Sequence, residues 1–175
     1  MPIWPKQESQ AMNSFYGDPD SNKDLTADAK WEATNIVDLV PPYTLYYPQE
    51  VNKVVIKRQT VFKRLRVHKV CKDSLEKILS AVPKEFTAAE IDAFELDICG
   101  GVYNFRLKRG GTSLSVHSWG AAIDLSHLIN AWKKKWRPEV GMMPVRMVKI
   151  FGDEGWTFGG TWSTPDAMHF QAADL

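Results

Sequence analysis

The C-terminal half of the chain is built from short apolar segments separated by glycines and turns. Residues 121–125 are apolar and bounded by turns, which predicts a core strand that contains an acid near its end. Residues 156–158 and 168–170 predict two further short strands. The apolar residues at 94, 96 and 98 alternate with polar ones, which predicts another strand before Gly100.

Apolar residues at helical spacing occur in two other places. They recur from Val70 to Val82 and are followed by Pro83, which predicts a helix over about 68–82. Residues 145–151 predict a second helix, which stops at Gly155. A mixture of helices and short strands of this kind favours an α+β fold over a doubly wound sheet.

The first fifty residues are acidic and rich in turn-forming residues, and residues 17–24 predict a loop. Acidic and amide side chains alternate in this loop somewhat as in a calcium-binding loop. Lys23 stands in the place of the turn glycine and Ala29 in the place of the closing glutamate. We therefore interpret it as a solvated loop.

The central part of the chain is basic. Residues 53–72 contain eight Lys or Arg and no acid, and residues 62–67 predict a half-exposed strand with its basic side chains outward. Nucleic-acid binding is one interpretation of this run, and a solvated strand face is the other. No nucleic-acid-binding motif accompanies it, so we expect no nucleic-acid partner.

Composition restricts the possible functions. A chain of 175 residues with 44% apolar residues can bury one core, and its net charge of +1 gives no overall field for DNA or an acidic membrane. Two Cys are too few for a cysteine zinc site, so any zinc site must use the four His and carboxylates. The sequence has neither a signal peptide nor a run of 18 apolar residues, which predicts a cytoplasmic protein without membrane insertion.

Two histidines and one aspartate in the C-terminal half of the chain can form a metal site. His117 and Asp124 are seven residues apart with Gly120 between them, and a glycine permits a tight bend that points both at one spot. His169, on a neighbouring strand, can supply a third ligand, which leaves a fourth zinc position for water. Asp166 lies three residues before His169, where a carboxylate can accept a proton without being a ligand.

A single histidine beside a glycine-rich turn is more often a structural residue than a metal ligand. The two remaining histidines, His68 and His127, are therefore interpreted separately. We interpret His68, near the start of the predicted helix, as a capping or packing residue. His127, just past the strand that contains Asp124, is interpreted as a surface residue or one that supports the ligands, with a ligand role as the minor alternative.

The spacing of these residues is similar to that of a known protein family. The pattern Ser115-x-His117-x-x-Gly120-x-Ala122-x-Asp124, followed by Asp166-x-x-His169-Phe170, resembles the M15 zinc peptidases of bacterial cell walls. That family contains D-alanyl-D-alanine carboxypeptidases and L-alanyl-D-glutamate endopeptidases. The flanking segments 100–106 and 155–162 are similar to phage or prophage endolysins of its endopeptidase branch.

The resemblance implies a fold and a set of roles. The fold would be a single Hedgehog/DD-peptidase-like domain, with a small antiparallel sheet flanked by helices. The catalytic core would span 61–175, with 1–60 as an N-terminal extension packed on it. The implied roles are zinc ligands for His117, Asp124 and His169 (one ion per chain), general base for Asp166, carbonyl or carboxylate binding for Arg106 or Arg109, and substrate contacts for Ser115, Trp119 and Trp162.

The resemblance also implies a function. We expect a monomeric endolysin that cuts the stem peptide of peptidoglycan between L-Ala and D-Glu, by attack of a zinc-activated water with Asp166 as base. It would be stored in the host cytoplasm and released through a holin, or carried in a virion. The alternatives are a D-alanyl-D-alanine carboxypeptidase, and a non-catalytic module that binds the wall or belongs to the virion.

Overall fold

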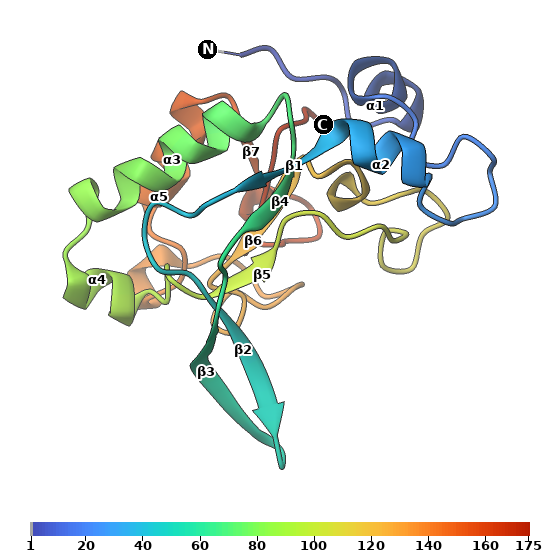
Figure 1. Cartoon of the computed structure of the whole chain (residues 1–175). Helices are drawn as coiled ribbons and strands as arrows, with labels where there is room; N and C mark the ends of the chain where they lie inside the picture. Colours follow the sequence, from blue (N-terminus) through green and yellow to red (C-terminus); the bar gives the residue numbers. More distant parts are fainter. Residues whose placement is uncertain (1) are drawn as a thin grey trace.

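The computed structural model describes residues 2–175, which contain five α-helices and eight strands (Figure 1). The helices are α1 (Ser9–Tyr16), α2 (Ala29–Asn35), α3 (Lys72–Glu85), α4 (Ala88–Ala93) and α5 (Val145–Asp153). The strands are β1 (Ile36–Leu39), β2 (Tyr46–Val51), β3 (Val54–Val61), β4 (Leu65–His68), β5 (Cys99–Gly101), β6 (Ala122–Leu125), β7 (Thr157–Phe158) and β8 (His169–Gln171). The predicted α+β class is confirmed.

The largest sheet has four antiparallel strands in the order β5-β6-β8-β7. Its centre is formed by β6 and β8, the two strands that the short apolar segments of the sequence predicted. Strand β8 is paired on both sides, because Gln171 is opposite Ala122 of β6 and Thr157 of β7. Both central strands are therefore held rigidly by backbone hydrogen bonds.

Helices α3 and α5 lie side by side against this sheet (Figure 1) and contribute Leu79 and Phe151 to the core. Helix α3 begins four residues later than predicted, since residues up to His68 pair with β1 as strand β4. It also continues through Pro83 to Glu85, so the predicted stop before that proline is wrong. Pro83 lies in the last turn of the helix, where its missing N–H interrupts few of the helix's backbone hydrogen bonds.

The predicted strand over 94–98 is wrong, because residues 94–97 form a turn after α4 and Ile98 makes only an isolated bridge with Tyr46. Helix α4 begins at a capping box in which Thr87 and Glu90 bond each other's backbone. The chain then turns back, and the amide of Leu96 donates to the carbonyl of Ile91. The alternation in the sequence does not mark a strand, because the polar Glu95 and Asp97 are buried as well and pair with basic side chains of β3. The regular strand starts only at Cys99.

The N-terminal segment is bonded to the last residues of the chain. The amide of Gln7 donates to the carbonyl of Asp174, and the hydroxyl of Tyr16 donates to the carbonyl of Ala172. The acids of the loop after α1 are used internally, since Asp20 accepts bonds from the backbone of its own loop. Strand β1 pairs with β4 across the predicted division at residue 60, which remains a prediction.

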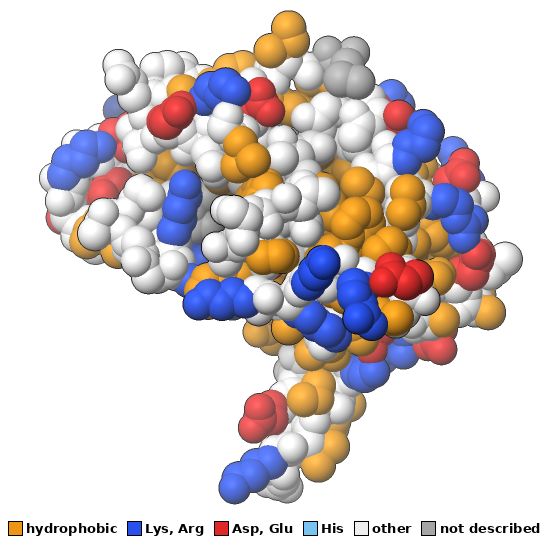
Figure 2. All heavy atoms as spheres, turned by 180° about the vertical axis from the view of Figure 1, so that it is seen from behind, with side chains coloured by type: hydrophobic (Ala, Val, Ile, Leu, Met, Phe, Trp, Pro, Cys, Tyr) orange, Lys and Arg blue, Asp and Glu red, His pale blue; other side chains and the backbone are white. Residues whose placement is uncertain are grey.

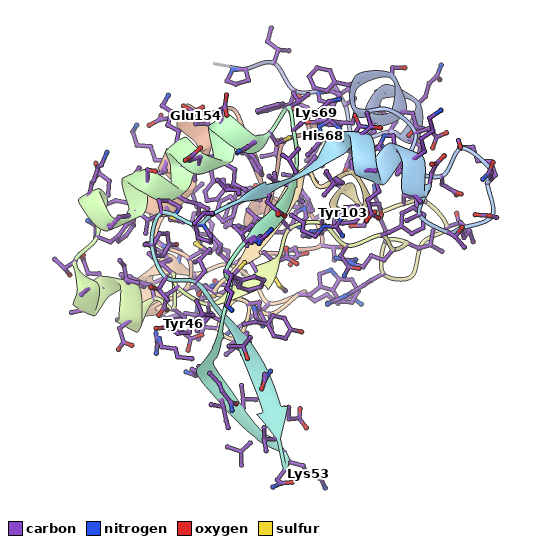
Figure 3. All side chains as sticks on the ribbon, viewed as in Figure 1. Tyr46, Lys53, His68, Lys69, Tyr103 and Glu154 are labelled. Carbon is purple, nitrogen blue, oxygen red and sulfur yellow. The ribbon has the colours of Figure 1, made fainter. Side chains whose placement is uncertain are left out.

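Strands β2 and β3 form a hairpin that projects from the body, with Tyr46 at its base and Lys53 at its tip (Figures 1 and 3). Hydrophobic side chains are visible on it in Figure 2. Those of Tyr47, Val51, Val54, Val55, Ile56 and Val61 are exposed.

The basic run 53–72 lies partly on this hairpin, and four of its eight basic side chains form ion pairs: Lys57, Arg58, Arg64 and Arg66. Lys57 contacts Glu95, and Arg58 binds Asp97 through two hydrogen bonds. These pairs attach the hairpin base to the turn that follows α4. The ion pairs match the interpretation of this run as a solvated strand face with structural contacts. Among residues 2–175, no helix combines the length and the apolar character that crossing a bilayer requires.

Candidate metal centre

A tight turn positions His117. It belongs to a short 3₁₀ segment, η1 (Val116–Trp119), which ends at Gly120 in the left-handed conformation with φ +66°. A Cβ on Gly120 would lie 2.8 Å from the backbone nitrogen of His68, so a side chain has no room there. Glycine tolerates both the left-handed conformation and the lack of space for a side chain. The chain can therefore turn from η1 into β6 at this residue.

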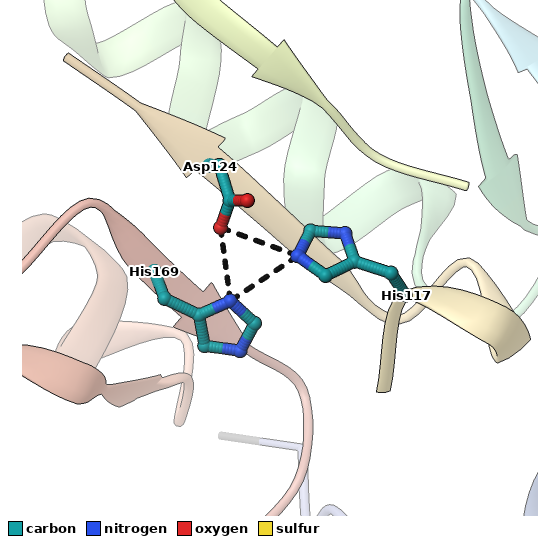
Figure 4. Close-up of side chains that lie close together, drawn as sticks. All are labelled: His117, Asp124 and His169. Carbon is teal, nitrogen blue, oxygen red and sulfur yellow. Dashed lines mark hydrogen bonds and ion pairs between the residues drawn. The ribbon is translucent and has the colours of Figure 1, made fainter. Parts of the chain in front are cut away.

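Strand pairing positions the other two residues. Asp124 of β6 and His169 of β8 are register partners, and both point toward His117 (Figure 4). Asp124 Oδ1 lies 2.9 Å from His169 Nδ1 and 3.2 Å from His117 Nε2, and the two imidazole nitrogens are 3.2 Å apart. One ligand atom from each residue therefore lies within 4.8 Å of the others, so the group can hold one metal ion.

The orientation of the imidazoles suits a zinc ion. His117 Nδ1 lies 2.7 Å from the carbonyl oxygen of Val102, and His169 Nε2 lies 3.2 Å from Gln171 Oε1. A ring nitrogen that donates to such an acceptor carries the proton, which leaves the inward nitrogen's lone pair for a metal. Two imidazoles and one carboxylate are the ligand set of a zinc site that keeps one position open.

Electrostatics favour the charged form of the carboxylate. Burial raises the pKa of Asp124, but the charge and hydrogen bonds of His117 and His169 outweigh it and hold this pKa well below its usual range. Burial lowers the pKa of His169, and the hydrogen bond and charge of Asp124 reverse that shift and raise it. An anion is thus held between two imidazoles in a site with little access to water.

Asp166 lies beside this group. Its amide donates to the carbonyl of Gly159 at 2.9 Å, and a Cβ on Gly159 would lie 2.6 Å from the Asp166 carbonyl, so the glycine permits the close approach. Burial raises the pKa of the Asp166 carboxyl. Its Oδ1 atom is buried and has no hydrogen-bond partner in the described part of the chain. This oxygen therefore lacks the hydrogen-bond partner that a buried polar atom usually has.

A cleft of about 340 Å³ opens over these residues, a volume in the range of small-molecule pockets. Asp124, Asp166 and His169 line it together with cationic and aromatic side chains. Arg106, Lys108 and Arg109 supply positive charge, and the guanidinium of Arg109 lies 5.5 Å from the centre of the Trp132 ring. The cleft combines a metal-ligating group with a basic wall.

The predicted substrate-binding residues lie in different places. Ser115 is buried and lines the cleft. Trp162 lines it too, 5.6 Å from His169 between ring centres, and its buried indole N–H has no partner among the described residues. Trp119 points into the core, where it is 1% exposed and donates to the carbonyl of Gly17. The structure thus places Trp119 outside the lining of the cleft.

The remaining histidines lie outside the metal-ligating group. His68 ends β4 rather than starting a helix, is buried, and contacts the carbonyl of Tyr16 through Nε2 at 3.0 Å (Figure 3). Its surroundings agree with the packing role predicted for it. His127 is half-buried, and its Nδ1 is without a hydrogen-bond partner within residues 2–175.

Seven residues of the cleft were not predicted from the sequence: Gln7, Lys108, Val116, Trp132, Thr164, Met168 and Gln171. Gln171 has a sequence signal, since it is two residues after His169 on a strand, and alternate strand residues share a face. Gln7 and Trp132 have no such signal, because the first lies far away in the sequence and the second lies in an irregular loop.

One family model matches part of the chain. The model of the D-alanyl-D-alanine carboxypeptidase family of M15 peptidases covers residues 109–172, which include the metal-ligating group and Asp166. Residues 109–172 are an M15 metallopeptidase domain. No curated protein and no solved structure matches the chain.

The match to the M15 model agrees with the architecture observed around the site. A mixed α+β domain with small antiparallel sheets agrees with the Hedgehog/DD-peptidase fold of that family. An M15 domain is a metal-dependent peptidase domain, and its substrates belong to the class of peptides or peptidoglycan.

Proposed function

We propose that this M15 domain hydrolyses the amide bond between L-Ala and D-Glu in the stem peptide of peptidoglycan. The observation that carries the proposal is the His117–Asp124–His169 group, whose Asp124 and His169 line a cleft with a basic wall. The resemblance of the sequence to endopeptidases of phage and prophage supports the choice of bond.

The basic wall matches the chemistry of this substrate. Stem peptides carry free carboxylates, and Arg106, Lys108 and Arg109 offer positive charge at the same cleft. A guanidinium binds a carboxylate through two parallel hydrogen bonds, which fixes the orientation of the peptide as well as holding it. Arg106 is half-buried and its backbone is anchored to Ser118 in both directions, so we assign it to the scissile region. The exposed Arg109 is assigned to a more distant carboxylate.

We assign separate roles in hydrolysis to the residues of the site. His117, Asp124 and His169 would hold zinc, and the chemistry that zinc supplies when bound is Lewis acidity, which polarises a carbonyl and acidifies water. Asp166 accepts a proton from the attacking water and returns it to the nitrogen of the leaving amine. Its unpartnered oxygen and its raised pKa suit a group that must both take and give a proton near neutral pH.

Neighbouring groups orient the substrate. Trp162 lines the cleft, and its indole N–H is buried without a partner among residues 2–175, so we assign it as a donor to a peptide carbonyl of the bound substrate. Ser115 caps the η1 segment and lies at the cleft, where its hydroxyl can bind the same backbone. These two donors and the basic wall favour an extended peptide with carboxylates on one side.

A second candidate is a D-alanyl-D-alanine carboxypeptidase. The description of the matching family model favours it. In that case one arginine of the cleft would bind the terminal carboxylate of D-Ala, and the cleft would accept only the end of the stem peptide. The two activities share all the proposed metal and proton chemistry and differ in the position of the cut.

The cellular role that we propose follows from the same resemblance. The protein would be a monomeric endolysin, kept in the host cytoplasm until a holin releases it to the wall, or carried by a virion. The similarity of residues 100–106 and 155–162 to phage and prophage lysins supports this role.

Digestion of purified peptidoglycan by the zinc-loaded protein separates these functions. Mass spectrometry of the products should show new L-Ala carboxyl ends on sugar-linked fragments together with new D-Glu amino ends. Loss of a single D-Ala from intact stem peptides would instead establish the carboxypeptidase. Absence of both products, with zinc bound at one ion per chain, would reject hydrolysis and leave a wall-binding module.

A further inference from the structure

We propose that Gln171 is a positioning residue that selects which nitrogen of His169 faces the metal. The inference rests on the proposed zinc-dependent function. It starts from the orientation of His169, which turns Nδ1, the nitrogen nearer the backbone, toward Asp124. The opposite nitrogen, Nε2, lies 3.2 Å from the side-chain oxygen of Gln171.

The orientation of the Gln171 amide is determined by a second bond. Its Nε2 atom donates to the carbonyl of Ala173 at 3.2 Å, so the oxygen must face His169. An amide oxygen only accepts hydrogen bonds, so it requires the proton on His169 Nε2. The His169 tautomer with a lone pair on Nδ1 is the one that this arrangement stabilises, and that lone pair points into the metal-ligating group.

The backbone around Gln171 keeps this contact in place. Gln171 is 1% exposed and lies on β8, which pairs with both β6 and β7 at this residue. The spacing of two residues on a strand puts His169 and Gln171 on the same face. The backbone of Gln171 is therefore held between two neighbouring strands, and its side chain is buried beside His169.

His117 is oriented in a different way. Its outward nitrogen bonds the main-chain carbonyl of Val102 at 2.7 Å, an acceptor that no substitution of a side chain removes. Within residues 2–175, Gln171 is the one side chain that bonds the outward nitrogen of either imidazole. A substitution at residue 171 can thus remove a contact of a metal-ligating imidazole without replacing a ligand.

Zinc affinity of matched variants tests the inference. Gln171→Met keeps the size of the side chain but removes the acceptor, and we expect its zinc Kd to rise by about 10- to 100-fold. Gln171→Glu keeps an acceptor oxygen and should recover most of this loss. Gln7→Met is the control, because Gln7 lines the same cleft but bonds neither imidazole. The affinities are measured by competition with a chromophoric chelator, and thermal unfolding of each metal-free variant reports its fold.

Nitrogen-15 NMR of the zinc-loaded wild-type protein tests the tautomer without any substitution. We expect the proton of His169 on Nε2 and the metal on Nδ1. A proton on Nδ1 would overturn the inference, and so would an unchanged Kd in a folded Gln171→Met variant while His169→Ala loses zinc. Those results would leave the proposed function intact. Failure of the wild-type protein to bind zinc would reject the metal site and the role of Gln171 together.

Discussion

Asp124 and His169 are opposite each other on the paired strands β6 and β8, and their side chains meet at 2.9 Å on one face of the sheet. Because the register of two central strands determines this contact, neither residue needs a flexible loop to reach the site. His117 completes the group from a turn that ends at Gly120. The metal-ligating atoms are thus positioned by backbone geometry before any ion binds.

Substitution of either imidazole should abolish zinc binding. His117→Ala and His169→Ala each remove one of three ligands, so we expect less than one tenth of the wild-type zinc content by elemental analysis, with activity lost in parallel. His127→Ala is the matched control, because this histidine lies outside the group. Zinc at one ion per chain in either ligand variant would contradict the assignment.

Asp166→Asn should separate metal binding from turnover. The amide has the size of the carboxylate but cannot accept the proton, so we expect a kcat lower by about 10²- to 10⁴-fold with unchanged zinc content. Asp153→Asn, at an exposed residue paired with Lys149, serves as the control and should keep full activity. Wild-type rates for Asp166→Asn on purified peptidoglycan would mean that another group is the base.

Gly120→Ala should disturb both the fold and the metal site. The new Cβ would meet the backbone of His68 at 2.8 Å in a left-handed conformation, so we expect a loss of about 3 kcal/mol in the free energy of unfolding and weaker zinc binding. Gly110→Ala also has positive φ, but nothing lies within 4 Å of its Cβ. This control should lose only about 1 kcal/mol, measured by urea unfolding. Equal losses in both variants would show that crowding at residue 120 is unimportant.

The stability of the protein should fall in mild acid because of His68. Burial lowers the pKa of His68 to about 4, below the value of about 6.5 in an unfolded chain. Unfolding therefore takes up a proton between these values, and stability is present at neutral pH and lost as the pH falls from 6.5 to 4. The loss should reach about 3 kcal/mol.

Urea unfolding of the metal-free wild-type protein and of His68→Gln at several pH values measures this effect. The variant should be less stable at pH 7 but should show a shallower decline toward pH 4. Parallel curves for the two proteins would show that His68 is not the group that titrates.

Several elements of the fold were predictable because their patterns are local. The apolar segment of β6 and the helical spacing of α5 are recognisable in short windows of sequence. The start of α3 was not, since pairing with β1 extends strand β4 to His68 and a turn follows before the helix begins at Lys72. The alternation at 94–98 was misleading because its polar residues are buried too: Glu95 and Asp97 pair with basic side chains of β3, which the local pattern does not reveal.

The sequence by itself determined the class of chemistry. With two cysteines and four histidines, a zinc site had to use imidazoles and carboxylates, and the spacing of His117, Asp124, Asp166 and His169 identified the candidates. The tertiary structure was needed to show which nitrogen of each imidazole faces inward, that Trp119 belongs to the core, and that Gln7 and Trp132 belong to the cleft. These features depend on strand register and on contacts between distant segments, and local sequence patterns do not encode either of them.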